Sequence, residues 1–207
     1  KVDEEKYDSV AEGLNKNMAS QERRSERKEL EKELAEIVMQ EGAEEVAKVG
    51  TDADGSITLE LGGGAFFKPG GAELADQAIP VLTSIYEELA SPIYQSFNIS
   101  VEGHTDDDPI NSPFFPSNWE LSAARASTVV RFMITNGIKK NRLKAIGMSD
   151  THPKVPNRDE EGTPIKENMI ENRRVMLRIS RNPIYFAPAI PKFRRGMANK
   201  GVSQSLE

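Results

Sequence analysis

Short stretches of alternating apolar and polar residues predict four β-strands. The alternation is clearest at residues 57–61 and 173–179, where every second side chain is apolar, as in a strand that buries one face. Residues 97–101 and 143–147 complete the set, and the former runs on to a stop at Gly103. These strands form the expected framework of the domain.

Longer stretches with apolar residues three and four positions apart predict helices between the strands. Pro80 interrupts the pattern at 72–90 and implies a kink or a late start. Ser117 with Glu120 forms a capping box, so Ser117 is the expected N-cap of the next helix, which ends at Gly137. A short helix is expected at 166–171. The order β-α-β-α-β-(α)-β predicts a two-layer α/β (α+β) fold, with helices packed on a mixed four-stranded sheet.

Charge divides the chain into three parts. Residues 1–50 carry nine Lys and Arg against fourteen Asp and Glu, a net charge of −5, whereas the remainder carries eighteen against nineteen. We interpret 1–50 as an acidic, partly disordered linker with a helix near 21–48, 51–181 as the folded domain, and 182–207 as a Pro-containing basic tail. Nothing in this balance favours nucleic-acid binding.

Neither cysteines nor a long apolar run is present in the sequence. A membrane helix needs about 20 consecutive apolar residues, so we expect the sequence as given to be a soluble piece. The glycines at 62–64 lack the Gly-Lys-Ser/Thr ending of a phosphate loop and predict a strand bend or bulge instead.

One cation stands out in the helix after Ser117. At 100° per residue, Arg125 falls within the apolar arc of that helix, near its start. The preceding loop carries Asp106, Asp107 and Asp108. Arg125 either pairs with one of these carboxylates, or faces them across a gap that holds a ligand bearing both charges.

The motifs GHTD, SNWELSAARA, VVRFMITNGIKKNRL and ENRRVMLRI occur in this order between residues 51 and 181. Together they resemble the OmpA-like peptidoglycan-binding domain, and SNWELSAARA resembles the flagellar-motor stator B subunits (MotB and PomB), most of all the sodium-driven PomB type. The resemblance implies a cell-wall anchor without enzymatic activity, cofactor or metal. Its implied location is the periplasmic part of a single-span inner-membrane protein of a Gram-negative bacterium. The implied partners are peptidoglycan, a second copy of the chain, the stator A subunit and periplasmic motor-ring proteins.

The resemblance also assigns roles to residues. Asp106 would bind the ammonium of a diaminopimelate stem-peptide end, and Arg125 would bind its carboxylate through a bidentate fork that Lys cannot reproduce. Arg173 is chosen over Arg174 because it shares the parity of the apolar residues of its strand. The remaining expected site residues are Thr105, Asn118, Leu121 and Ser122.

Two alternatives remain open. His104, Asp106 and His152 could hold a zinc ion for cell-wall hydrolysis, since three protein ligands leave an open position. Within the binding class, the alternative is a cell-wall tether of a lipoprotein or porin, not connected with motility.

Overall fold

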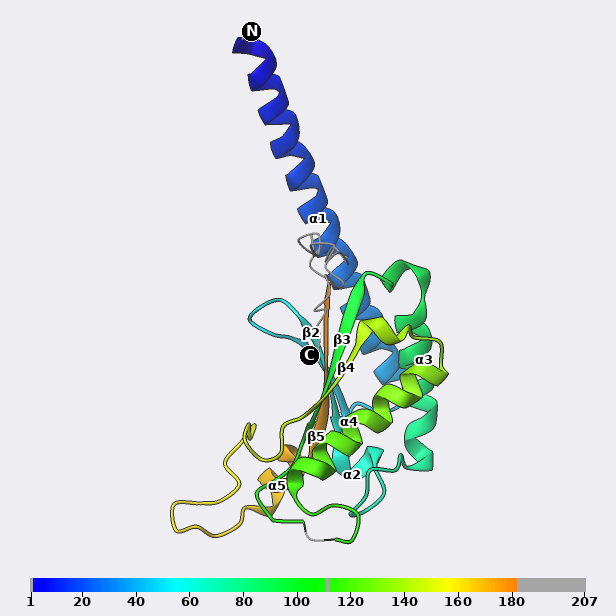
Figure 1. Cartoon of the computed structure of the whole chain (residues 1–207), viewed down its shortest axis with the longest axis vertical. Coiled ribbons are helices and arrows are strands. Elements are labelled where there is room, and N and C mark those ends of the chain that lie inside the picture. Colours follow the sequence, from blue (N-terminus) through cyan, green and yellow to red (C-terminus); the bar gives the residue numbers. More distant parts are fainter. Residues whose placement is uncertain (1, 111, 182–207) are drawn as a thin grey trace, which may run out of the picture.

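The computed structural model describes residues 2–110 and 112–181, with the backbone alone for 2–16 and 19. The helices and strands, drawn in Figure 1, are α1 (Val2–Gln40), β1 (Ala47–Thr51), β2 (Ile57–Gly62), α2 (Gly63–Phe66), α3 (Ile79–Ala90), β3 (Phe97–His104), α4 (Asn118–Thr135), β4 (Leu143–Gly147), α5 (Lys166–Asn172) and β5 (Arg174–Arg181). The expected tail, 182–207, lies outside the described residues.

The strands form one mixed sheet in the order β1-β2-β5-β3-β4. Neighbouring strands are antiparallel, except that β3 and β4 are parallel. Figure 1 shows α3, α4 and the C-terminal part of α1 on one side of this sheet. The two-layer fold with a mixed sheet is therefore confirmed.

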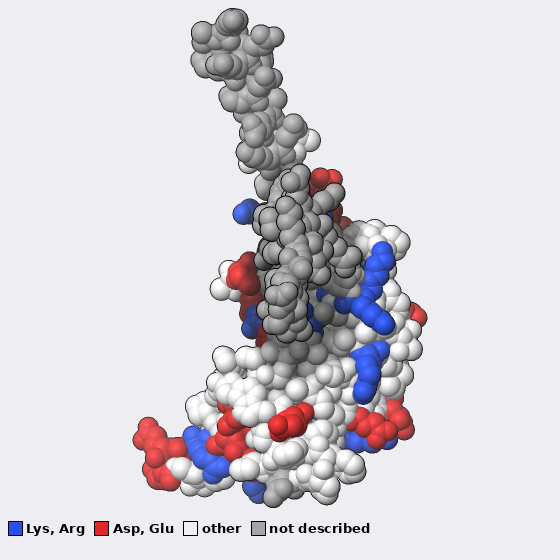
Figure 2. Space-filling model, in the orientation of Figure 1, with Lys and Arg blue, Asp and Glu red and all other residues white. Residues whose placement is uncertain are grey.

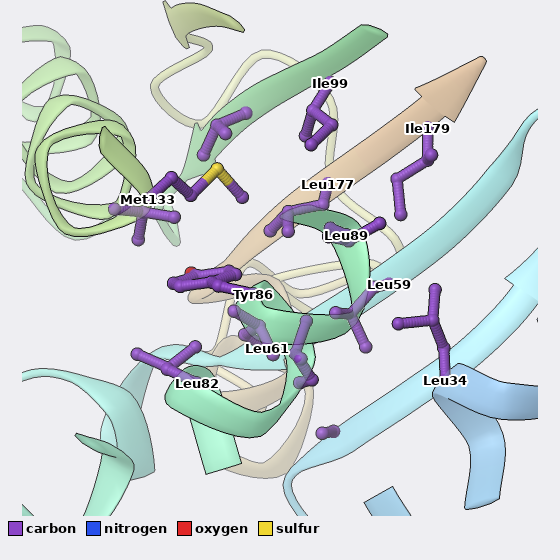
Figure 3. Packing of buried hydrophobic residues seen from close by; sticks show 14 of the residues in the cluster. Leu34, Leu59, Leu61, Leu82, Tyr86, Leu89, Ile99, Met133, Leu177 and Ile179 are labelled. Carbon is purple, nitrogen blue, oxygen red and sulfur yellow. The ribbon is translucent and has the colours of Figure 1, made fainter. Parts of the chain in front are cut away.

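The core lies between the sheet and these helices. Figure 3 shows Leu59, Leu177 and Ile99 of the strands packed toward Tyr86 of α3 and Met133 of α4, and all five are fully buried. Strand β2 alternates buried and half-buried positions along its whole length, as its sequence pattern predicts.

The sheet has five strands, so the prediction of four was wrong. The additional strand, β1, lies at the sheet edge within residues that we assigned to the linker, and only Ala47 of its five residues is buried. An edge strand with one buried side chain has almost no alternation to detect. Leu30, Leu34 and Val38 of α1 also belong to the core.

Helix α1 differs from its predicted range at both ends. It begins at Val2, where we expected little order, and ends at Gln40 instead of continuing to 48. Gly42 has a positive φ of 63°, and the Ala43 N–H donates to the Val38 carbonyl at 2.9 Å. This is the Schellman arrangement that terminates helices.

Two other local predictions have a clear outcome. Helix α3 starts late, at Ile79, with Pro80 in its first turn, where a missing N–H costs nothing. Residues 63–66 form the short helix α2 rather than the strand bend that we expected. No helix in the described part of the chain is long and apolar enough to cross a membrane.

Candidate functional site

The start of α4 is fixed by its own sequence. The Ser117 hydroxyl accepts a hydrogen bond from the Trp119 N–H at 3.2 Å and donates one to the Glu120 carboxylate. The predicted N-cap and capping box are therefore confirmed.

Two glycines let α4 lie directly against the ends of β3 and β4. A Cβ at Gly103 would stand 2.1 Å from the Ser122 carbonyl oxygen, and one at Gly147 would stand 2.9 Å from Ala123. Only glycine permits this approach. It brings Arg125, one turn further along α4, close to the loop that follows β3.

Asp106 opens that loop and is buried, with 7% of its surface exposed. Its carboxylate forms an ion pair with Arg173, which lies between α5 and β5. The direct partner of Asp106 is therefore Arg173 and not Arg125, and Asp107 and Asp108 pair with Arg158. The reading in which Arg125 pairs with a carboxylate of the loop was therefore wrong.

Arg125 has no carboxylate partner within ion-pair distance among the residues that the structure describes. It is 6% exposed, its Nε donates to the Gly71 carbonyl at 2.9 Å, and its guanidinium carbon lies 5.2 Å from the centre of the Phe67 ring. Burial lowers the pKa of this guanidinium to about 10, and the charge of Arg173 adds to the shift while Asp106 opposes it. Arg125 is thus a buried cation with incomplete compensation.

Arg125 and Arg173 both line a pocket of about 280 Å³, together with Gly63, Gly64, Phe67, Lys68, Pro69 and Gly70. Lys68 is half exposed and pairs with Glu73 at 3.0 Å. The pocket wall therefore carries three cations. Lys68 pairs with Glu73 and Arg173 pairs with Asp106, which leaves Arg125 without a carboxylate among the described residues. Such a pocket favours an anionic group.

The other expected site residues hold the loop in place. Thr105 and Ser122 are buried, and both form hydrogen bonds with the backbone of Ser149. The Thr105 N–H donates to the Ser149 carbonyl at 2.9 Å, and the Ser149 N–H donates to the Ser122 hydroxyl at 3.1 Å. Asn118 donates to the carbonyls of Asp106 and Asp108 at 3.2 and 2.9 Å. These side chains are not among those that line the pocket.

Leu121 is 5% exposed and is likewise absent from the pocket wall. The structure does not assemble the histidines into a metal site. The buried His104 ring lies 3.6 Å from Glu102, whereas His152 contacts Thr151. In the part of the chain that the structure describes, no three His, Cys, Asp or Glu residues are grouped to hold a metal.

Sequence reasoning missed three residues that shape the site. Lys68, and Gly71 with its carbonyl, belong to no sequence motif that would single them out. Ser149 has a φ of 51°, a conformation that non-glycine residues rarely adopt and that often marks functional sites. No alternation or spacing signals such a residue, because its conformation depends on partners distant in sequence.

Comparisons with known proteins identify the family and agree with the fold. Residues 66–166 match the OmpA family. A protein described as MotB-like from Desulfovibrio vulgaris is 31% identical over 78% of this chain and 98% of its own, with a TM-score of 0.68. The cell wall anchor of the T6SS from Pseudomonas aeruginosa is 28% identical over 72% of this chain and 97% of its own, with a TM-score of 0.61.

Motility protein B of Helicobacter pylori strain J99 is 28% identical over 63% of this chain. The chain spans 54% of that protein and 33–40% of two further curated relatives from Bacillus subtilis. The chain therefore belongs to the OmpA family, and its relatives include proteins of the MotB type.

Proposed function

We propose that this domain binds peptidoglycan without covalent attachment, by recognising the zwitterionic end of a diaminopimelate stem peptide. The observation that carries the proposal is Arg125, a buried cation that opens onto a pocket and has no carboxylate partner in the described chain. A ligand carboxylate completes its coordination, and Asp106, which pairs with the pocket-lining Arg173, offers a negative charge for the ligand ammonium.

Arg173 has two roles in this proposal, one in the free protein and one when the ligand is bound. In the free protein it neutralises Asp106, and its side chain is 37% exposed and able to move. When a ligand ammonium approaches Asp106, Arg173 becomes available to the ligand carboxylate beside Arg125. The site then holds two cations and one anion of the protein against a ligand end with one charge of each sign. The remaining positive charge favours additional carboxylates on the same stem peptide.

We further propose that binding anchors a flagellar stator to the cell wall as a homodimer. The support is the resemblance to MotB-type proteins and to a cell wall anchor of another system. In this proposal the chain is the periplasmic part of a single-span inner-membrane protein that joins a stator A subunit, with motor-ring proteins as further partners. It binds rather than catalyses. A dimer on one polymer raises the effective concentration for the second contact. Assignment to the sodium-driven type stays a prediction.

Co-sedimentation with purified sacculi tests the binding proposal. A charge-assisted hydrogen bond contributes about 1.5–3 kcal/mol, so Asp106→Asn and Arg125→Ala should each weaken binding by about tenfold or more. Arg131→Ala, an exposed arginine on the same helix, is the matched control and should bind as wild type. Unchanged binding by both site variants, with unaltered circular dichroism, would show that the pocket is not the wall site.

A motility assay separates the stator from a wall tether of another system, such as a lipoprotein or porin. Deletion of the gene should abolish swimming while flagella are still assembled. Normal swimming of the deletion strain would rule out the stator role and leave the wall-binding proposal in place.

A further inference from the structure

Three consecutive aspartates after β3 are divided between two arginines. Asp106 pairs with Arg173, whereas Asp107 and Asp108 both pair with Arg158. The Arg158 Nε lies 2.6 Å from Asp107, and one of its Nη atoms lies 2.9 Å from Asp108. One guanidinium therefore holds two carboxylates next to the site.

Arg158 is carried by a hairpin, residues 157–165, in which Arg158 and Pro164 pair antiparallel. The Asp159 carboxylate accepts hydrogen bonds from the Glu161 and Thr163 N–H groups at 3.1 and 2.7 Å, which fixes the turn. This hairpin projects from the lower left of the domain in Figure 1, and Figure 2 shows acidic side chains at its tip with a basic one behind them. The turn thus fixes the backbone that carries Arg158.

The hairpin is anchored next to the other arginine. Asn172 is fully buried, and its side chain accepts from the Lys154 and Val155 N–H groups at 2.8 and 3.1 Å and donates to Asn157 at 2.8 Å. Asn172 directly precedes Arg173 in the chain. The two arginines are therefore placed from one common fixed point.

The exposure of the surrounding side chains indicates the role of Arg158. The side chains of Asp107 and Asp108 are 26% and 62% exposed, and that of Arg173 is 37% exposed, so each retains freedom to change partners. Without Arg158, two uncompensated carboxylates would adjoin the Asp106–Arg173 pair. They would compete for Arg173 and repel an incoming ligand carboxylate.

We propose that Arg158 is a positioning residue for wall binding: it holds Asp107 and Asp108 away from Arg173, so that Asp106 alone faces the ligand. This inference rests on the proposed function of the pocket. It assigns Arg158 no contact with the ligand. Its effect passes through the two carboxylates that it neutralises.

A charge-rescue cycle tests the proposal in the full chain. Arg158→Gln should weaken co-sedimentation with sacculi about tenfold, and adding Asp107→Asn and Asp108→Asn should restore binding to within about twofold. The same two Asn substitutions in the wild-type background should change binding less than twofold. A merely structural role for Arg158 would not be rescued, because the triple variant also lacks every ion pair of the hairpin.

The proposal is overturned if Arg158→Gln binds as wild type, or if the triple variant stays as weak as Arg158→Gln. It is also overturned if the two Asn substitutions raise binding in the wild-type background by the same factor as in the Arg158→Gln background. Their effect would then be a general consequence of removing negative charge. Absence of wall binding by the wild type would instead refute the proposed function. In that case amide hydrogen exchange of residues 106–110 tests separately whether Arg158 holds Asp107 and Asp108 in place. Faster exchange in Arg158→Gln is expected, and unchanged exchange would contradict this role of Arg158.

Discussion

Replacement of Arg125 by methionine should stabilise the free protein while it weakens wall binding by about tenfold or more. Arg125 is a buried cation whose charge is only partly compensated, and methionine keeps most of its volume without the charge. A buried charge retained at the expense of stability is what a binding site requires when the ligand supplies the counter-charge.

The magnitude follows from the pKa of Arg125, which burial lowers from the ordinary arginine value to about 10. Each pKa unit of this lowering corresponds to about 1.4 kcal/mol, so the charged side chain destabilises the fold by about 3 kcal/mol. Because the folded-state pKa is below the unfolded one, this penalty is fully present at pH 7 and disappears only as the pH rises through about 10 toward the ordinary pKa of arginine.

Methionine also removes two favourable contacts of Arg125. The hydrogen bond to the Gly71 carbonyl contributes about 1 kcal/mol, and the stacking on Phe67 contributes about 0.5–1 kcal/mol. The net gain is then about 1 kcal/mol, which corresponds to a rise in melting temperature of about 2–4 °C for a domain of this size.

The measurement is thermal unfolding at pH 7 beside co-sedimentation with sacculi. Arg142→Met is the matched control, since Arg142 is equally buried but donates to the carbonyls of Phe97, Leu89 and Tyr94 at 2.7, 3.0 and 2.9 Å. Loss of three buried hydrogen bonds should lower stability by at least about 3 kcal/mol, and wall binding below the melting temperature should persist.

The reasoning is refuted if Arg125→Met loses as much stability as Arg142→Met. That result would mean that the guanidinium of Arg125 is satisfied within the fold and needs no ligand. Full retention of wall binding by Arg125→Met would refute its role in the site, whatever the change in stability.

Three further substitutions test the framework of the site. Gly103→Ala should lower stability by several kcal/mol because its Cβ would meet α4, whereas Gly64→Ala, with nothing within 4 Å, should leave urea unfolding unchanged or stabilise the fold. Ser149→Gly should keep wall binding and raise the melting temperature slightly, since its φ of 51° suits glycine; a large loss of binding would show that its hydroxyl is required. Leu34→Ala should cost about 3 kcal/mol in urea unfolding and Met39→Ala, 60% exposed, almost nothing; equal effects would contradict the inclusion of α1 in the core.

Much of the fold was predictable because its signals are local. The alternation at β2 and β5, the cap at Ser117 and the late start at Pro80 each depend on a few neighbouring residues. Asp106 and Arg125 followed from motif resemblance together with a cation in an apolar arc. The close approach of α4 to β3 agrees with Gly103, although the distance itself needed coordinates.

The remaining features depend on contacts between distant residues. Strand β1 exists because Leu61 and its neighbours offer it a register, and its own sequence resembles the end of a helix. The pairing of Asp106 with Arg173 spans 67 positions. Arg158 lies in the loop between β4 and α5, and no motif or periodicity marks it. In each case the sequence supplies the residue, and the tertiary fold selects its partner.

The way α1 joins the domain has a mechanical consequence. Its 39 residues, at roughly 1.5 Å each, give a rod of about 58 Å, and its C-terminal part is packed in the core through Leu30, Leu34 and Val38. A force applied at Val2 therefore reaches the sheet through interlocked apolar side chains rather than slack chain. The rod acts as a lever on β1, the edge strand beside it, so that strand is where an excessive torque would first peel the domain open.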